Sequence, residues 1–356
     1  MLFVDALGGL GYAAPLFFEL TMSTASKTRL VLPALLSCLT TPATAEVIEE
    51  VLVIASHQPQ TLSQIGSAIS RIDADELSTH TSTNAADLLR NVAGISVNQS
   101  GPMGALTQVR MRGAEANHTL VLIDGVRVND VSLGSEFNFA QITNADISHI
   151  EVLRGPQSAR YGSDAIGGVI GIFTQESESA GWHGQANLGL GQFNTQDLGG
   201  RLGFRSAGKD TGSWSAQLNI NRLDTDGIDA SPSGNELDGF RNTHINAKAL
   251  LDLSATATLR VNLRQVNTQS EGDKQDFDFP TTATQGLIVD ADERVDSQQR
   301  HLHLAYSQTA GNWQYDAALT RSLSSTDYLS NGARASGLRG ERLLLDLQGS
   351  RSFAVG

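Results

Sequence analysis

The chain has 356 residues, of which 40% are hydrophobic and 18% charged, and its formal net charge is -13. A chain this apolar can bury a core and is not disordered by composition. Its acidity argues against a nucleic-acid partner, because the phosphate backbone would repel it. The single cysteine, Cys38, excludes an internal disulfide and a multi-cysteine metal site. The 35 glycines favour turn-rich β structure.

The beginning of the chain carries the pattern of an export signal. Within residues 22–45, two basic residues precede a short apolar run, and an A-x-A cleavage site ends at Ala45. We therefore expect a cleaved signal peptide, and we interpret residues 1–21, which fit no such scheme, as an upstream extension. A lipoprotein signal ending at Cys38 is the alternative. The sequence holds no run of ~18 uninterrupted apolar residues, so a membrane role would fall to β-strands.

Residues 60–175 mix short helical and strand patterns, which predicts a compact α+β domain. Short β-type runs occupy residues 69–72, 95–99, 107–112, 119–123 and 150–153. One helix is predicted to open at Asp73, and a second to cover residues 84–91 with Thr83 or Asn84 as its N-cap. Asp124-Gly125, which directly follows an apolar strand, predicts a tight hairpin turn.

From residue 182 to residue 356 the pattern changes to runs of about ten residues in which polar and apolar side chains alternate. We count about eight such strands, as expected for outer-membrane barrel sequences. Their connections alternate in length: residues 207–212, 254–255 and 309–311 are short, and residues 223–242, 268–297 and 323–340 are long. Short turns at one end and long loops at the other are typical of an outer-membrane β-barrel. A soluble β-sandwich also alternates, but its strands usually have about five or six residues.

Three motifs carry a more specific resemblance. The first is a short apolar-acidic segment that can add as an edge strand to a partner sheet, formed by Glu50, Val51, Leu52, Val53, Ile54 and Ala55. The second joins residues 109–113 to residues 120–127. The third runs from Ile150-Glu151-Val152-Leu153-Arg154-Gly155-Pro156 to residue 170. In this order the motifs resemble the TonB-dependent outer-membrane receptors.

This resemblance implies a domain plan. Residues 46–59 would hold the TonB box and a linker, residues 60–175 a plug domain, and residues 182–356 a partial barrel. We therefore expect a mainly β chain, with an α+β plug domain followed by an incomplete antiparallel transmembrane β-barrel of about eight of the 22 strands found in such transporters. The chain is interpreted as a truncated receptor of the cell outer membrane, with TonB and membrane lipid as partners.

Charged residues in the plug motifs are expected to hold the plug in place. Arginine can bind a carboxylate through two parallel hydrogen bonds, which suits a domain inside a polar lumen. We expect the following residues to pair with one another or with the inner barrel wall: Arg110, Arg112, Glu151, Arg154 and Arg160. Ordinary surface arginines are the alternative.

Within the family, residues 122–127 and 163–169 resemble cobalamin receptors most. This implies that plug loops 98–108 and 129–138 face outward and touch the substrate, through Asn98, Gln99, Ser100, Met103, Leu106, Asn129, Asp130, Ser132 and Phe137. A ferric siderophore is the main alternative, although acidic loops would not favour an anionic chelate. A secreted β-rich binding protein without transport is the second alternative.

Carboxylates gather in the two long connections that precede residue 297. Several carboxylates on adjacent loops can bind calcium, which takes six to eight oxygen ligands. The resemblance to cobalamin receptors implies that calcium orders these loops, and the best-placed ligands are Asp229, Glu236, Asp238, Asp276 and Asp278. A solvated acidic loop is the alternative. No enzymatic activity and no catalytic cofactor are expected, because the sequence has neither G-x-S-x-G nor H-E-x-x-H.

Overall fold

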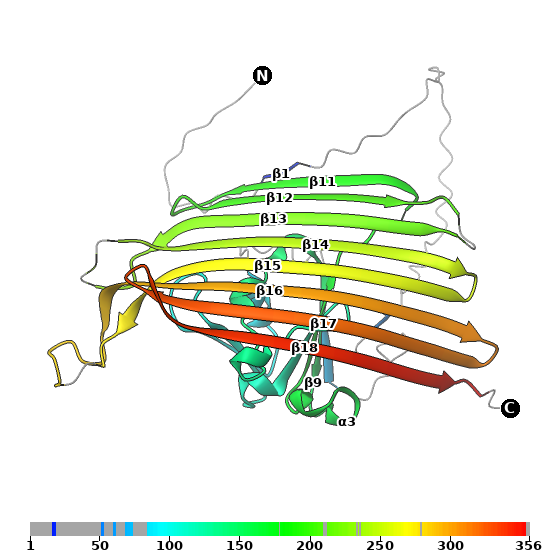
Figure 1. Cartoon of the computed structure of the whole chain (residues 1–356), viewed down its shortest axis with the longest axis horizontal. Coiled ribbons are helices and arrows are strands. Elements are labelled where there is room, and N and C mark those ends of the chain that lie inside the picture. The colour runs from blue at the N-terminus through cyan, green and yellow to red at the C-terminus, as the bar shows by residue number, and fades with distance from the viewer. Residues whose placement is uncertain are drawn as a thin grey trace, which may run out of the picture.

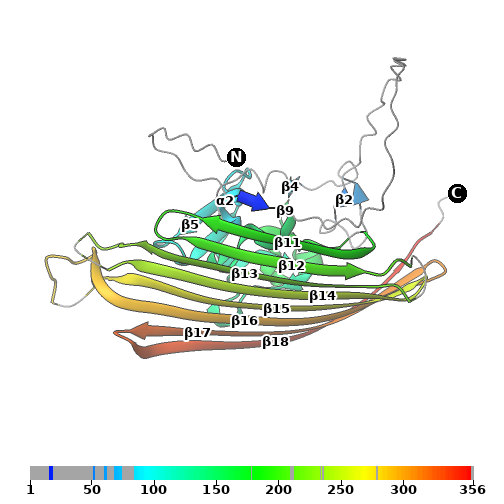
Figure 2. The same ribbon diagram turned by 90° about the horizontal axis from the view of Figure 1, so that it is seen from above.

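The chain folds into a small mixed domain that lies against one face of a large curved sheet (Figures 1 and 2). The computed structural model describes residues 16–18, 51–52, 60–61, 68–73, 84–177, 179–208, 212–232, 234, 236–277 and 280–353. The predicted signal peptide therefore lies outside the described residues, as does the helix expected after Asp73. Asp73 itself ends a strand.

The small domain, which we call the plug, is built on a five-stranded mixed sheet. Strand β10 pairs in parallel with β7, and the other neighbours are antiparallel. In spatial order the strands are β4 (Ala68–Asp73), β9 (Ile147–Arg154), β10 (Gly168–Thr174), β7 (Thr119–Ile123) and β8 (Val126–Arg127). Strands β10 and β7 carry few polar residues and are buried along most of their length, as is typical of strands that are covered on both faces.

Short elements cover the plug sheet and complete its core. They are α2 (Ala85–Leu89), α3 (Ser158–Tyr161), the strand pair β5 (Ile95–Gln99) and β6 (Thr107–Met111), and the 3₁₀ helices η2 (Ala116–His118), η3 (Val131–Leu133), η4 (Phe139–Gln141), η5 (Asn144–Asp146) and η6 (Ser163–Ala165). Leu88, Leu89 and Phe139 are buried in the main apolar cluster, together with residues from β6, β7, β9 and β10. A second, smaller cluster lies around Leu120 and Leu153.

Local sequence signals place most plug elements correctly. The strands predicted at 95–99 and 119–123 have those bounds. Asn84 caps α2, because its Oδ1 accepts a hydrogen bond from the Ala86 amide at 2.8 Å. Asp124 and Gly125 have φ of 49° and 81°, as the predicted hairpin turn requires.

The large sheet contains the eight strands that the alternating pattern predicted, each antiparallel to the next in chain order. They are β11 (Gly181–Leu190), β12 (Gln196–Arg205), β13 (Trp214–Ile228), β14 (Asp238–Ser254), β15 (Ala257–Gln275), β16 (Ile288–Ala310), β17 (Trp313–Ser330) and β18 (Ala333–Arg351). A short strand, β1 (Leu16–Phe18), pairs with β11 at the edge of the sheet farthest from β18. The sheet curves around the plug without closing, so it is a partial barrel.

The two faces of this sheet differ in chemistry. On β13, Leu218 and Ile220 point outward and are 44% and 45% exposed, whereas Gln217, Asn219 and Asn221 point inward and are buried against the plug. An apolar outer face around a polar lumen is the pattern of an outer-membrane barrel. No helix in the described part of the chain is long and apolar enough to cross a bilayer.

Aromatic side chains gather on the outer face near the short turns. Phe204 lies between Trp182 and Trp214, with ring-centroid distances of 5.0 and 4.9 Å. Trp313 and Tyr315 stack farther along the same end of the sheet. Aromatic belts of this kind mark the membrane–water interface of barrels. We call this the short-turn end and the opposite one the long-loop end.

The strands are longer than predicted, and one predicted loop is wrong. Strands β13 to β18 have 15 to 23 residues rather than about ten. The connection expected over residues 323–340 is a continuation of β17 and β18, which meet at a two-residue turn. Asn331 and Gly332 form this turn with φ of 50° and 72°. The strands extend because residues beyond the apolar band continue to pair.

Candidate functional site

A buried ion pair fastens the plug to the barrel wall. Lys248 Nζ on β14 lies 2.9 Å from Asp124 Oδ1, and the two side chains are 9% and 6% exposed. Asp124 stands at the β7–β8 turn and also accepts hydrogen bonds from the amide and hydroxyl of Thr174. Asn262 Nδ2 on β15 donates to the second carboxylate oxygen at 3.3 Å. One plug carboxylate therefore binds two wall strands.

A second buried carboxylate, Asp146 at the end of η5, binds two more amides of the wall. Asn219 Nδ2 on β13 donates to Asp146 Oδ1, and Asn246 Nδ2 on β14 donates to Asp146 Oδ2, both at 3.0 Å. Burial raises the pKa of Asp146 to about 6, and the hydrogen bond from Asn246 and the charge of Lys248 partly oppose this rise. We call Asp124, Asp146, the 174–176 segment and the wall residues that bond to them the β12–β15 anchor.

Further polar contacts extend the anchor along the end of β10. Gln217 Nε2 donates to the Gln175 carbonyl at 2.6 Å, and Arg201 on β12 donates to the Gln175 side chain. Lys248 Nζ also donates to the Thr174 carbonyl at 3.2 Å. Strands β12 to β15 are thus held to the plug by polar groups of the 174–176 segment as well as by the two carboxylates.

Contacts to β16 and β17 are more widely spaced. Gln141 Nε2 donates to Ser297 Oγ at 3.1 Å, and its carbonyl accepts from Asn242 Nδ2 at 3.1 Å. Ser324 Oγ on β17 donates to Asp130 Oδ1 at 2.6 Å. The Asp130 contact fixes the loop that contains η3 to the wall near the long-loop end.

The arginines predicted to pair with one another or with the wall instead bond to other groups of the plug. Arg154 donates to the Ala93 carbonyl at 2.8 Å and to Ser70 Oγ at 3.0 Å, which ties β9 to β4 and to the turn after α2. Arg110 donates to Gln108 Oε1 at 3.2 Å. The structure corrects the prediction for these two residues: they bond within the plug, while Asp124 and Asp146 bind the wall.

The other three charged residues of the plug motifs also have neighbours within the plug. Glu151 is fully buried on β9, and its Oε1 lies 3.4 Å from His149 Nε2. The Arg160 guanidinium lies over the ring of Tyr161. Arg112 has φ of 52° and approaches Gly155, where an added Cβ would lie 3.1 Å from its Nη1.

The two plug loops predicted to touch substrate lie toward the long-loop end. The first approaches β14 so closely that a Cβ on Gly104 would lie 2.1 Å from the Phe240 ring. The second packs on β18, where a Cβ on Gly340 would lie 2.7 Å from Val131 Cγ2. Both wall positions belong to the halves of β14 and β18 that run to the long-loop end.

The residues predicted in these loops are not equally accessible. In the first loop Asn98, Gln99 and Ser100 are exposed, and Met103 and Leu106 are 38% and 39% exposed.

In the second loop Ser132 is half-buried, whereas Asn129, Asp130 and Phe137 are buried. Asn129 Oδ1 accepts a hydrogen bond from the Val121 amide, and Asn129 Nδ2 donates one to the Thr119 carbonyl. Phe137 packs edge-on against Phe139. In this conformation Asn129 and Phe137 stabilise the plug and do not present a surface to substrate.

Acidic residues of the β13–β14 loop and of strands β14, β15 and β16 meet at the long-loop end. Ligand atoms of Asp229, Asp238 and Asp273 lie within 4.8 Å of one another, as do those of Glu236, Asp273 and Asp290. The sequence prediction included the first two residues and Glu236 but missed Asp273 and Asp290. These two come close because β15 and β16 extend beyond the apolar band.

The remaining predicted metal ligands behave differently. Asp276 is buried and accepts hydrogen bonds from Thr282 and Thr284, which identifies it as a loop-stabilising residue in this conformation. Asp278 lies outside the described residues. Desolvation raises the pKa of Glu236, and repulsion from Asp290, Asp273 and Asp238 raises it further. The cluster therefore concentrates negative charge, as a hard cation site requires.

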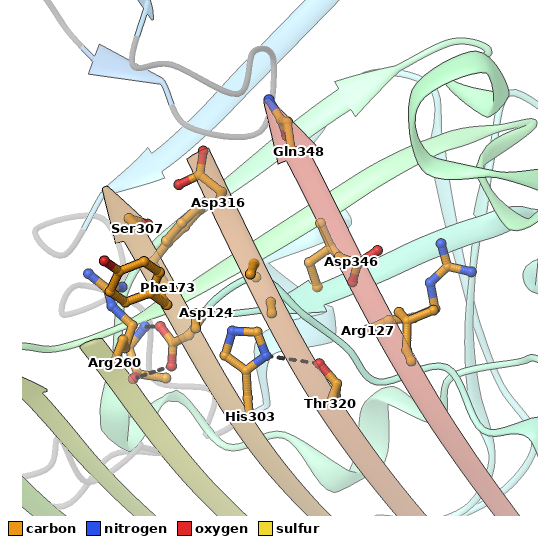
Figure 3. Close-up of a pocket in the computed structure, with 18 of the residues that line it drawn as sticks. Asp124, Arg127, Phe173, Arg260, His303, Ser307, Asp316, Thr320, Asp346 and Gln348 are labelled. Carbon is orange, nitrogen blue, oxygen red and sulfur yellow. Dashed lines mark hydrogen bonds between the residues drawn. The ribbon is translucent and has the colours of Figure 1, made fainter. Parts of the chain in front are cut away.

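A cavity of about 1570 Å³ separates the plug from β15–β18 (Figure 3). Figure 3 shows His303 and Thr320 joined across β16 and β17 by a hydrogen bond, which is 2.9 Å long. The charged lining residues are four arginines and five carboxylates: Arg71, Arg127, Arg160, Arg260, Asp73, Asp124, Glu176, Asp316 and Asp346. Charges of both signs therefore face this space.

A small mixed domain seated by buried polar groups against an outward-apolar, unclosed barrel sheet is the architecture that the resemblance to TonB-dependent receptors implied. The family model described as TonB-dependent Receptor Plug Domain matches residues 61–169. These residues therefore belong to the TonB-dependent receptor plug family, and the recognition made from the motifs is confirmed.

Individual relatives agree with this class. The chain is 36% identical over 189 residues to the vitamin B12 transporter BtuB of Vibrio vulnificus (strain YJ016), covering 52% of this chain and 30% of that protein. Among solved structures it is similar to the siderophore receptor PirA of Acinetobacter baumannii, with a TM-score of 0.63 and 18% identity over 80% of this chain and 45% of that one.

The ferric enterobactin receptor PfeA of Pseudomonas aeruginosa is also similar, with a TM-score of 0.57 and 17% identity over 79% of this chain and 45% of that one. At these identities the two structures show a shared fold. The chain spans less than half the length of each of these relatives.

Proposed function

We propose that this chain is the receptor portion of an energy-coupled importer in the cell outer membrane, and that its substrate is cobalamin. The observation that carries the proposal is the plug, held in a polar lumen by the buried carboxylates Asp124 and Asp146. A plug fixed in this way separates the two ends of the lumen, so passage of a large solute requires that the plug move. The site has the properties of a gated transporter, and we assign it no catalytic step.

The identity of the substrate rests on sequence similarity. The relative with 36% identity is named a vitamin B12 transporter, which supports cobalamin. A ferric siderophore is the second candidate, because siderophore receptors share the fold. The long-loop end carries an acidic cluster that would repel an anionic chelate, which favours the less anionic cobalamin.

Energy would come from TonB in the periplasm, through residues 50–55. Of this segment, Val51 and Leu52 form strand β2 and pair with β3 (Gln60–Thr61), and the rest lies outside the described residues. A segment that already adopts an extended strand is suited to join the edge of a partner sheet. Its position before the plug would let a pull on the N-terminus act on β4, an edge strand of the plug sheet.

We further propose that calcium binds the acidic cluster at the long-loop end. Asp273 belongs to both groups of ligands, so it would bridge the β13–β14 loop and the β15–β16 extension. Carboxylate oxygens within 4.8 Å of one another fit the size and charge of a hard cation. Bound calcium would remove the mutual repulsion of these groups and order the loops around the substrate.

The decisive experiment measures cobalamin binding to the chain in outer-membrane vesicles, with calcium or with a chelator. We expect saturable binding that calcium strengthens and that a ferric siderophore does not displace. Asp273→Asn is expected to abolish the calcium effect. Asp224→Asn is the matched control, because Asp224 pairs with Arg222 and Arg241 and lies outside both ligand groups.

Displacement by a ferric siderophore with no binding of cobalamin would overturn the substrate assignment. Equal calcium effects in Asp273→Asn and Asp224→Asn would overturn the metal site.

A further inference from the structure

The plug is held unevenly along the part of the barrel wall that β11–β18 form. Toward β12–β15 it makes the buried Asp124–Lys248 pair and the Asp146 bonds to Asn219 and Asn246. Toward β15–β18 it faces the cavity of about 1570 Å³. Separating the two charges of a buried ion pair leaves each of them without a partner in a dry environment, which is strongly unfavourable. Movement of the plug away from β16–β18 meets less resistance than movement away from the anchor.

Two spaces lie in succession along the same wall. A small pocket near the long-loop end is lined by Asn129 and Asp130 of the plug and by Gln299, His301 and Arg342 of the wall. The large cavity begins at the next inward row, which contains His303, Thr320 and Leu344. Successive inward rows are two residues apart along a strand, or about 6.6 Å. The two spaces therefore adjoin.

The large cavity continues to the short-turn end. Its wall is formed there by Ser307 and Asp316, which pair with each other close to the 311–312 turn, and by Gln348 (Figure 3). Ala305 and Ala318 pair in the middle of this wall, and their small side chains leave the space open. The small pocket, which has a volume of about 10 Å³, and the large cavity thus follow one another along the wall, from a plug loop near the long-loop end to the short-turn end.

We infer that the substrate crosses between the plug and strands β16–β18, while the β12–β15 anchor on the neighbouring strands of the same sheet holds the plug. This inference rests on the proposed function. In the resting conformation the Asp130–Ser324 hydrogen bond, 2.6 Å long, closes the passage at the side nearer the long-loop end. A shift of the loop that contains η3 away from β17 opens it, and the plug does not need to leave the barrel.

The lining of the passage indicates the chemistry of its cargo. Arg127, Arg160 and Arg260 line the cavity together with Asp316 and Asp346, so donors and acceptors of both charges are present. A wall of this kind offers many exchangeable hydrogen bonds without the strong attraction that would trap a multiply charged ion. It suits a large solute that is rich in amide or hydroxyl groups and has little net charge.

The test uses cysteines in the full chain with Cys38→Ser as background. Ala318→Cys places a thiol in the cavity wall, and Val266→Cys places one on β15 at a position that is 1% exposed against the plug. A bulky maleimide is expected to label the first in the folded protein and the second only after denaturation. Equal protection of both thiols would contradict the claim that the wall at Ala318 borders an accessible cavity.

A second measurement tests transport. Cells that express the receptor completed to a closed barrel and carrying Ala318→Cys are treated with the same maleimide, and cobalamin binding and uptake are measured. We expect binding to persist and uptake to be lost. Asn331→Cys is the control, because it is labelled at the exposed hairpin tip outside the cavity and uptake is expected to continue.

The outcomes separate the inference from the proposed function. Unchanged uptake in labelled Ala318→Cys, with binding intact, would overturn the passage along β16–β18 and leave the receptor assignment standing. Absence of cobalamin binding in the unlabelled variant would overturn the proposed function and the passage that rests on it. Protection of the Val266→Cys thiol in a chain that also carries Ala318→Cys confirms that the Ala318→Cys substitution leaves the protein folded.

Discussion

A single lysine, Lys248, neutralises the buried plug carboxylate Asp124. Lys248→Met keeps the length and apolar stem of the side chain but leaves the carboxylate without a cation. We expect the free energy of unfolding of the purified chain in detergent to fall by about 3–5 kcal/mol, since a buried charge loses its partner. A urea titration measures this loss.

Arg260→Met is the matched control, because it also removes an inward cation. The Arg260 side chain is 44% exposed and lies 3.7 Å from Glu176, which is 48% exposed. Solvent screens such a pair, so the expected loss is below about 1 kcal/mol. Equal losses in the two variants would show that the Asp124–Lys248 pair does not anchor the plug.

Gly340 shows how little space separates the plug from β18. A Cβ at this position would lie 2.7 Å from Val131 Cγ2 and 2.7 Å from Ser324 Oγ. We expect Gly340→Ala to lower the free energy of unfolding by about 1–3 kcal/mol, as other overpacked substitutions do. Gly349→Ala on the same strand is the control, because its Cβ would meet Tyr315 Cδ1 at 4.0 Å. A neutral Gly340→Ala would contradict the close packing of the loop that contains η3.

At the scale of elements, local signals were sufficient where a structure depends on neighbouring residues. The Asn84 cap and the Asp124-Gly125 turn are of this kind, and both were predicted. Strand length in the barrel depends on pairing instead. Beyond the apolar band the strands carry no alternating signal, so residues 323–340 looked like a loop.

The projecting β17–β18 hairpin is held by its own charged pairs. Asp327 on β17 accepts hydrogen bonds from Arg334 at 2.8 Å and from Arg339 at 2.9 and 3.0 Å, both on β18. We expect the amides of residues 323–330 to exchange slowly with deuterium, because β16 and β18 flank them. The β15–β16 connection over residues 280–287 is the internal reference for rapid exchange. Equally rapid exchange in both segments would restore the loop interpretation.

At the scale of the whole molecule, the contacts between plug and barrel could not be read from the sequence. The motifs identified the plug family, but Asp146 and its partners Asn219 and Asn246 are separated by 73 and 100 residues. Polar residues on inward barrel positions all look alike until the strand register places some opposite a plug carboxylate. The acidic cluster was predicted in part for the same reason: Asp273 and Asp290 join it through the register of β15 and β16.

The attachment of the plug to the wall is expected to depend on pH through Asp146. Burial raises the pKa of this carboxyl from 3.8 to about 6. The folded protein then holds the proton more tightly than the unfolded chain does. Stability is therefore highest below the unfolded pKa and falls as pH rises from 3.8 to about 6, by roughly 3 kcal/mol for a shift of this size.

Asp146→Asn lacks this titration but keeps a side chain of the same shape that can still accept one hydrogen bond from Asn219 or Asn246. Unfolding free energies of the wild type and this variant are compared by urea titration on both sides of the pH window. The free energy of unfolding of the wild type is expected to fall relative to that of Asp146→Asn as pH rises. Only the wild-type carboxyl must ionise in a buried site. A constant difference across the window would mean that Asp146 does not control the attachment, and that the neighbouring cations Lys248 and Arg201 compensate for its burial.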